Sequence, residues 1–93
     1  MNLSTQPENE TLLTFPCAYP LKIMGKNHPS LLEEVELLFK KHVPDFDMAC
    51  LITRSSKAGT YLSVSCTIQA HSKDQLDALY QDLTASEIVL MAL

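Results

Sequence analysis

One eleven-residue stretch, 60–70, constrains the fold of this chain more than any other. Its side chains alternate strictly between polar and apolar. The polar set is Tyr61, Ser63, Ser65, Thr67 and Gln69, and the apolar set is Leu62, Val64, Cys66, Ile68 and Ala70. A period of two is typical of a β-strand with one face on a core and one face open. Since half-covered strands occur mainly in antiparallel sheets, the stretch predicts a central antiparallel strand.

Three further strands are expected around it. The segment 19–24 predicts a short first strand that Gly25 ends. The segment 46–53 alternates in the same way, with Phe46, Met48, Cys50 and Ile52 on one side. The polar turn 54–59 then joins it to the central strand as a hairpin. The apolar end, 87–93, predicts the last strand.

Two amphipathic helices complete the pattern. Pro29 and Ser30 open the first helix, with Ser30 and Glu33 as a capping box, and Pro44 ends it. Ser72 and Gln75 form the capping box of the second helix. The residues expected to be buried recur at helical spacing: Leu31, Leu32, Val35, Leu38, Phe39 and His42 in the first helix, and Leu76, Leu79, Tyr80 and Leu83 in the second.

The expected element order is therefore βαββαβ in an α+β domain. Right-handed crossovers place both helices on one face of a four-stranded antiparallel sheet with strand order 4-1-3-2, the ferredoxin-like arrangement. Residues 1–11 are polar and predict a loose tail, and 12–93 form one domain. The polar side chains of the central strand then line the face of the sheet that the helices leave open.

Composition narrows the function classes. The chain has seven Lys and Arg against eleven Asp and Glu, so its net charge is −4 and it has no general attraction for nucleic acid or anionic membranes. Cys17, Cys50 and Cys66 are unclustered and odd in number, which indicates a reducing compartment. The N-terminal stretch does not have the pattern of a secretory signal. We expect a soluble cytoplasmic protein.

Several short motifs in fixed order resemble a known family. They are Phe15-Pro16, Lys22-Ile23-Met24-Gly25, Pro29, Ser55-Ser56-Lys57, Tyr61 with Ser63-Val64-Ser65, Leu79-Tyr80 and the terminal segment 88–93. Together they resemble the YbeD-like family of small bacterial proteins of unknown function. The resemblance covers residues 15–93 and implies an ACT-like domain, similar to modules that bind amino acids in metabolic enzymes, with a link to lipoate metabolism. Ala58 lengthens the family's Ser-Ser-Lys-Gly turn by one residue.

Two loops are candidate binding sites. Gly25, Lys26, Asn27 and His28 lie where ACT-like domains hold a ligand, before a helix N-terminus that favours a carboxylate. The alternative interpretation is a strand-to-helix turn that needs glycine. The second loop combines two cations with hydroxyl and backbone donors, and its residues are Arg54, Ser55, Ser56, Lys57 and Gly59. It is either an anion or partner site or a solvated hairpin turn.

Other chemistries have less support from the sequence. RNA reading on this topology needs several outward aromatic side chains, and only Tyr61 qualifies. The three histidines, His28, His42 and His71, and the cysteines show no metal-ligand spacing. Cys50 and Cys66 are expected to be small core residues. No cysteine is placed beside a base and an orienting group. We therefore expect no cofactor, no metal and no catalytic activity.

The function expected from these features is that of a small regulatory or adaptor protein. It would act through protein contacts, with the exposed sheet face of Tyr61, Ser63, Ser65 and Thr67 as its most distinctive surface. Its small core favours a homodimer, formed either by symmetric pairing that buries the open, hydroxyl-rich sheet face or by edge-to-edge pairing of the apolar terminal strand. The alternative is a sensor of an amino acid or small carboxylate at Gly25–His28. An enzyme of lipoate metabolism would need a catalytic constellation that the residues do not supply.

Overall fold

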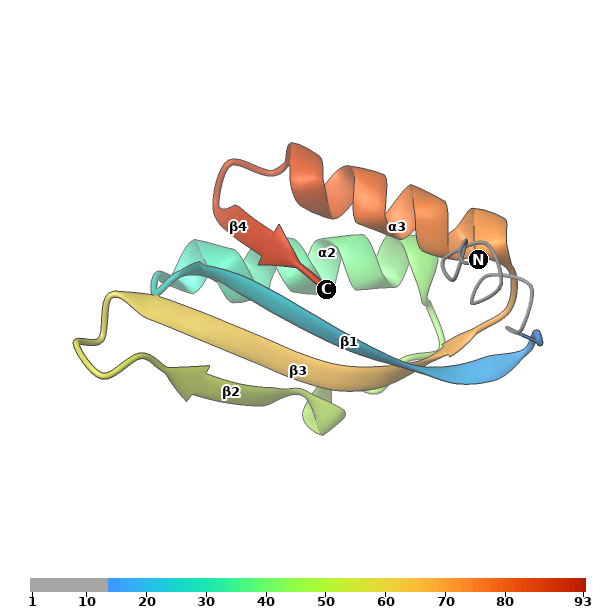
Figure 1. Cartoon of the computed structure of the whole chain (residues 1–93), viewed down its shortest axis with the longest axis horizontal. Coiled ribbons are helices and arrows are strands. Elements are labelled where there is room, and N and C mark those ends of the chain that lie inside the picture. Colours follow the sequence, from blue (N-terminus) through green and yellow to red (C-terminus); the bar gives the residue numbers. More distant parts are fainter. Residues whose placement is uncertain (1–13) are drawn as a thin grey trace, which may run out of the picture.

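A four-stranded antiparallel sheet carries two helices on one face (Figure 1). The computed structural model describes residues 14–93, so the tail predicted for 1–11 lies outside the described residues, as do Leu12 and Leu13. The elements are β1 (Cys17–Lys26), α2 (Pro29–His42), η1 (Met48–Cys50), β2 (Ile52–Ser55), β3 (Tyr61–Ala70), α3 (Lys73–Ala85) and β4 (Val89–Ala92). The strand order β2-β3-β1-β4 confirms the predicted ferredoxin-like topology.

The core lies between the helices and the sheet. The buried set comes from both layers, and within residues 14–93 it contains no polar or charged residue. Its members are Leu21, Ile23, Leu31, Val35, Leu38, Phe39, Val43, Val64, Cys66, Ile68, Ala70, Leu76, Leu79, Leu83 and Val89. The apolar face of β3 is therefore the face against the helices, as its alternation predicted.

The predicted second strand, 46–53, was wrong over its first six residues. The segment 46–51 is irregular apart from the 3₁₀ helix η1, and only Ile52–Ser55 pairs with β3. Asp47 explains the difference because its Oδ1 accepts a hydrogen bond from the Ala49 backbone N–H at 3.0 Å, a local bond that competes with strand pairing. Phe46 packs edge-on against Phe39, with 5.2 Å between ring centroids. Cys50 is consequently exposed and is not the core residue that was predicted.

The start of the first helix also differs from the prediction. Pro29 is its first residue as expected, but the cap is His28 rather than Ser30. The Nδ1 atom of His28 accepts a hydrogen bond from the Ser30 backbone N–H at 3.1 Å. Leu32, predicted as buried, lies on the exposed side of α2. β1 extends to both sides of the predicted 19–24, so Gly25 lies within the strand.

Ser72 caps α3 as predicted, but the Gln75 side chain bonds to the residue before the cap and to the other helix, so the predicted capping box is only half formed. Ser72 Oγ accepts a hydrogen bond from the Gln75 backbone N–H at 3.1 Å. The Gln75 side chain accepts one from the His71 N–H at 2.6 Å and donates one to the His42 carbonyl at 2.8 Å. Asp82 adds a second connection, since one oxygen of its carboxylate lies 2.7 Å from His42 Nε2 and 3.1 Å from Lys41 Nζ. The helix layer is thus fixed by polar contacts as well as by the core.

Candidate functional site: the open face of the sheet

The open face is the side of the sheet that no helix covers, and strand register decides which side chains share it. Residues paired across neighbouring strands project to the same face. One row across the sheet therefore consists of Ile52, Ser65, Lys22 and Leu93, and the next consists of Arg54, Ser63, Met24 and Met91. Leu93 joins the first row because its backbone N–H and C=O exchange hydrogen bonds with Lys22 at 2.8 and 3.1 Å. All four strands contribute to this face.

Large apolar side chains on this face remain in contact with solvent. Ile52 is 68% exposed, Leu93 65%, Met91 49% and Tyr61 45%. Isolated exposed hydrophobics are ordinary, whereas several on one continuous face indicate an interaction surface. These four come from β2, β3, β4 and the residue after β4, and they surround a strip of hydroxyl groups.

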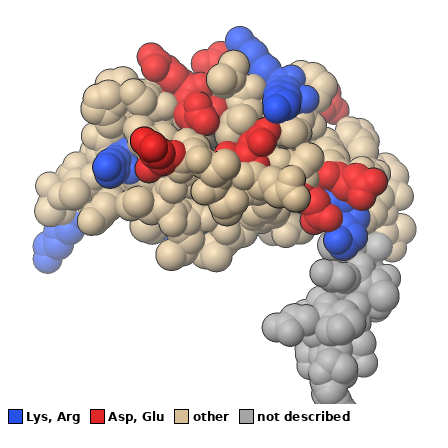
Figure 2. Space-filling model, turned by 90° about the horizontal axis from the view of Figure 1, so that it is seen from above, with Lys and Arg blue, Asp and Glu red and all other residues tan. Residues whose placement is uncertain are grey.

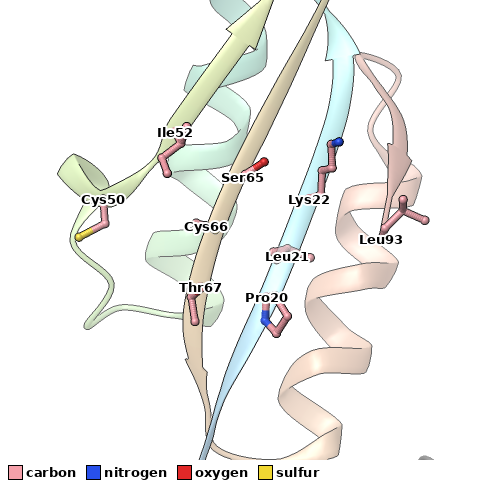
Figure 3. Close-up of a pocket in the computed structure, with 9 residues that line it drawn as sticks. All are labelled: Pro20, Leu21, Lys22, Cys50, Ile52, Ser65, Cys66, Thr67 and Leu93. Carbon is pink, nitrogen blue, oxygen red and sulfur yellow. The ribbon is translucent and has the colours of Figure 1, made fainter.

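The face is hollowed along its middle. A shallow depression of about 720 Å³ is lined by Pro20, Leu21, Lys22, Cys50, Ile52, Ser65, Cys66, Thr67 and Leu93. Figure 3 shows these residues on β1, β2, β3 and η1 and at the end of the chain after β4, with both helices behind the sheet. A second hollow is lined by Lys22, Met24, Arg54, Ser55, Ser56, Tyr61 and Ser63, and a third by Lys22, Met24, Met91 and Leu93. Lys22 therefore lies where the three depressions meet.

Charge is segregated between the two layers. Within residues 14–93, Lys22, Lys26, Arg54 and Lys57 have no carboxylate within ion-pair distance, whereas each lysine of the helices has one. All four belong to the strands or to the β2–β3 hairpin. The described acidic residues are all outside the strands and that hairpin: Glu33, Glu34, Glu36, Asp45, Asp47, Asp74, Asp77, Asp82 and Glu87. Figure 2, seen from above, shows acidic side chains interspersed with basic ones on that side of the molecule.

Some of the hydroxyl groups predicted as binding groups have internal partners. Ser63 Oγ donates to the Arg54 carbonyl at 3.3 Å, and Ser56 Oγ accepts from the Tyr61 backbone N–H at 3.0 Å. Among the described residues, no partner is found for the hydroxyls of Ser65 and Thr67. Tyr61, Ser63, Ser65 and Thr67 thus share one face of β3, where Ser63 and Ser65 are half-buried and the hydroxyls of Ser65 and Thr67 are available to a partner.

The two predicted binding loops lie against each other. Asn27 Nδ2 donates to the Gly59 carbonyl at 3.0 Å, and the Asn27 backbone N–H donates to the Thr60 carbonyl at 3.0 Å. Lys26 and Lys57 therefore lie at the same end of the sheet. The ligand-binding role predicted for these loops remains a prediction.

Gly25 itself is required by packing. A Cβ atom there would lie 2.5 Å from the Ile88 carbonyl oxygen and 2.7 Å from Leu31 Cδ1. The close approach is to the protein's own backbone and core, so packing around β1 accounts for this glycine without a turn or a ligand. His28 likewise uses its Nδ1 atom as the cap of α2. Of the four residues in this loop, Lys26 has the side chain most available for a ligand.

The titratable groups with shifted pKa values belong to the packing of the domain. Burial raises the pKa of the Cys66 thiol to about 11, so the thiol stays protonated at neutral pH and is a poor nucleophile. Burial and the hydrogen bond to Tyr19 raise the pKa of Tyr80. Hydrogen bonds from His42 and then Lys41 lower the pKa of the Asp82 carboxyl. Tyr80 and Asp82 lie on α3, and Cys66, although it borders the depression on the open face, belongs to the buried core.

Residues 14–93 contain neither a metal-ligand cluster nor a membrane-spanning helix. No three His, Cys, Asp or Glu side chains gather in a way that could hold a metal ion. Neither described helix has the length and apolar character that a membrane span requires.

The site contains residues that the sequence did not single out. Lys22, Met24, Ile52, Met91 and Leu93 join the predicted polar strip through strand pairing. A partial signal was present, since Lys22 stands between the inward residues Leu21 and Ile23 and must therefore point outward.

The fold and this face define a small ferredoxin-like α+β domain with one sheet face uncovered. The chain belongs to the family described as "Protein of unknown function (DUF493)", which matches residues 10–93. It is 48% identical to a UPF0250 protein of Nitrosomonas europaea over 90% of this chain and 97% of the relative. It is 38% identical to one of Paraburkholderia phytofirmans, over 91% and 96%. A third, from Neisseria gonorrhoeae, is 37% identical over 96% and 99%. These matches confirm the resemblance to the YbeD-like bacterial family.

Proposed function

We propose that this chain is a non-catalytic regulatory or adaptor protein that recognises another protein through the open face of its sheet. The observation that carries the proposal is the continuous exposed surface of apolar and hydroxyl side chains across all four strands. Such a surface, broad and shallow, matches the flat contact areas of protein partners better than the enclosed clefts that small molecules occupy.

A non-catalytic role is supported by the chemistry of the described groups. The cysteine nearest the centre of the sheet, Cys66, is held as a neutral thiol. The closest His–carboxylate pair, His42 with Asp82, joins the two helices on the side away from the open face. Neither arrangement presents an activated nucleophile to a substrate on that face.

The proposal includes a homodimer formed by the outer edge of β4. Leu90 on this strand is 52% exposed, and β4 pairs on one side only, with β1. Edge-to-edge pairing of two copies would satisfy the free backbone groups and leave the open face uncovered. Sedimentation velocity over a wide range of concentrations tests it, and a purely monomeric profile would contradict the dimer.

Site-specific photo-crosslinking tests the recognition surface. A benzophenone amino acid is placed at Ser65 on the open face, or at Glu36 on the exposed side of α2 as the matched control. In cells of a bacterium that encodes a protein of this family, we expect discrete protein adducts from position 65 and none of the same mass from position 36. Identical adducts from both positions, or none from position 65, would overturn the proposal.

A second candidate function, a small-carboxylate sensor, has one specific observation in its favour. The loops containing Lys26 and Lys57 meet through Asn27, so two cations lie at one end of the sheet. Thermal unfolding against amino acids, lipoate, octanoate and simple anions tests it. A ligand at 100 times its dissociation constant stabilises the fold by about 2.7 kcal/mol. Lys26→Gln should remove the shift, whereas Gly25 variants would disturb packing and are unsuitable.

A further inference from the structure

The charges of the open face indicate what kind of protein it binds. The chain as a whole is acidic, with net charge −4. In contrast, every charged residue of its described strands and of the β2–β3 hairpin is a lysine or an arginine. Among residues 14–93, Lys22, Lys26, Arg54 and Lys57 have no ion-pair partner, although every lysine of the helices has one. A surface whose sign is opposite to that of the rest of the molecule is a feature of electrostatic recognition.

We infer that the open face binds an acidic protein segment that carries apolar side chains among its carboxylates. This inference rests on the proposed function and gives its partner a chemistry. Carboxylates of the segment would pair with Lys22 and Arg54, and its apolar groups would cover Ile52, Met91 and Leu93.

The register of the sheet sets the spacing of the recognised charges. Lys22 and Arg54 lie two strands and one same-face row apart. With about 4.8 Å between strands and about 6.7 Å between same-face residues, their Cα atoms are roughly 12 Å apart. In an extended segment, residues four positions apart project to one face and are separated by about 13 Å. Two acidic residues at that spacing therefore match the two cations.

Other occupants fit the surface less well. A single-stranded RNA would supply negative charge, but base stacking requires aromatic side chains, and Tyr61 is the exposed aromatic residue on the described strands. A second copy of this chain placed face to face would bring its cations toward those of the first copy, since no Asp or Glu is present on the described strands to pair with them.

The test uses the ¹⁵N-labelled full chain and four defined probes. Three are short extended peptides that share one background of valine and threonine residues. They differ only in the pair of residues placed four positions apart, which is two Glu in the first, two Gln in the second and two Lys in the third. The fourth is a single-stranded oligouridine. We expect the Glu peptide to bind best, to shift the amides of Lys22, Ser63 and Ser65, and to weaken steeply between about 0.05 and 0.5 M salt.

Paired variants separate the face from net charge. The double substitution Lys22→Gln/Arg54→Gln should lower the affinity for the Glu peptide by about tenfold, which is the effect of losing two exposed ion pairs. Lys40→Gln/Lys73→Gln removes the same charge from the helices and should leave affinity within about twofold. Unchanged amide spectra away from the substituted residues would show that both variants are folded.

Each remaining outcome decides against the inference. Equal binding of the three peptides, stronger binding of oligouridine, shifts confined to the helices, or equal loss in both double variants would overturn it. Shifts of the open-face amides that grow with protein concentration alone would assign the face to a second copy. If position 65 gives discrete crosslinks but the peptides bind without regard to charge, the proposed function stands and only the inference of an acidic partner fails.

Discussion

Gly25→Ala tests whether packing alone demands glycine at the end of β1. The added Cβ would lie 2.5 Å from the Ile88 carbonyl oxygen and 2.7 Å from Leu31 Cδ1. Neither neighbour can move easily, because the oxygen accepts a hydrogen bond from the Lys26 N–H at 3.3 Å and Leu31 is fully buried. The substitution therefore forces the strand away from α2 and from the segment that precedes β4.

The expected cost follows from overpacking in a small domain. Inserting a methyl group into a filled site costs about 1–3 kcal/mol. For a domain of this size each kcal/mol lowers the melting temperature by about 4–8 °C, so we expect a decrease of roughly 5–20 °C. Urea unfolding followed by circular dichroism would give the free energy of unfolding, and a thermal scan would give the melting temperature.

Gly59 provides the matched control. It has a positive φ of 76°, and a Cβ there would meet nothing within 4 Å. Asn tolerates this backbone region, so Gly59→Asn should cost well under about 1 kcal/mol. A Gly25→Ala protein within about 0.5 kcal/mol of the parent would refute the packing explanation and reopen the ligand interpretation of this glycine.

Three further predictions concern the helix layer and the cysteines. The pKa of the Asp82 carboxyl is lower in the folded state than in the unfolded state. The stability that this carboxylate contributes is therefore fully present above its ordinary pKa and is lost as the pH falls through its folded-state pKa. Asp82→Asn should therefore flatten the acid side of the pH–stability curve from urea titrations; an unchanged curve would count against this ion pair. Cys50 is exposed and should react with a thiol reagent at once. Cys66 should react only on unfolding, because burial shields its thiol and raises its pKa to about 11. Equal reaction rates for the two cysteines would contradict the buried placement of Cys66. Leu79→Ala should cost about 2–5 kcal/mol in denaturant titrations, whereas Leu37→Ala, at a residue 62% exposed, should cost little, and similar losses would contradict the core assignment.

The sequence alone determined the elements whose signal is local and periodic. The alternation over 60–70 predicted both the strand and the face that packs on the helices, because side chains in a strand alternate whatever the strand pairs with. The apolar spacing of the helices and the cap at Ser72 were likewise local features. With the element order known, handedness rules left one strand order, and the structure has it.

The tertiary structure decided what depends on contacts between distant residues. Alternation over 46–53 carried the same signal as the central strand, but only its last two residues pair with β3. Asp47 accepts a hydrogen bond from the Ala49 N–H and Phe46 packs on Phe39, and these contacts favour the 3₁₀ helix η1. The need for glycine at position 25 arises from Ile88, sixty-three residues away in the chain.

The candidate site was determined in the same two parts. Tyr61, Ser63, Ser65 and Thr67 follow from a single strand and were predicted as an exposed face. Lys22 and Arg54 join them only through the register of β1 and β2 against β3, and Met91 through that of β4. Register is set by which residues meet across strands, and a pattern of period two within one strand fixes the face of each side chain but not its neighbours.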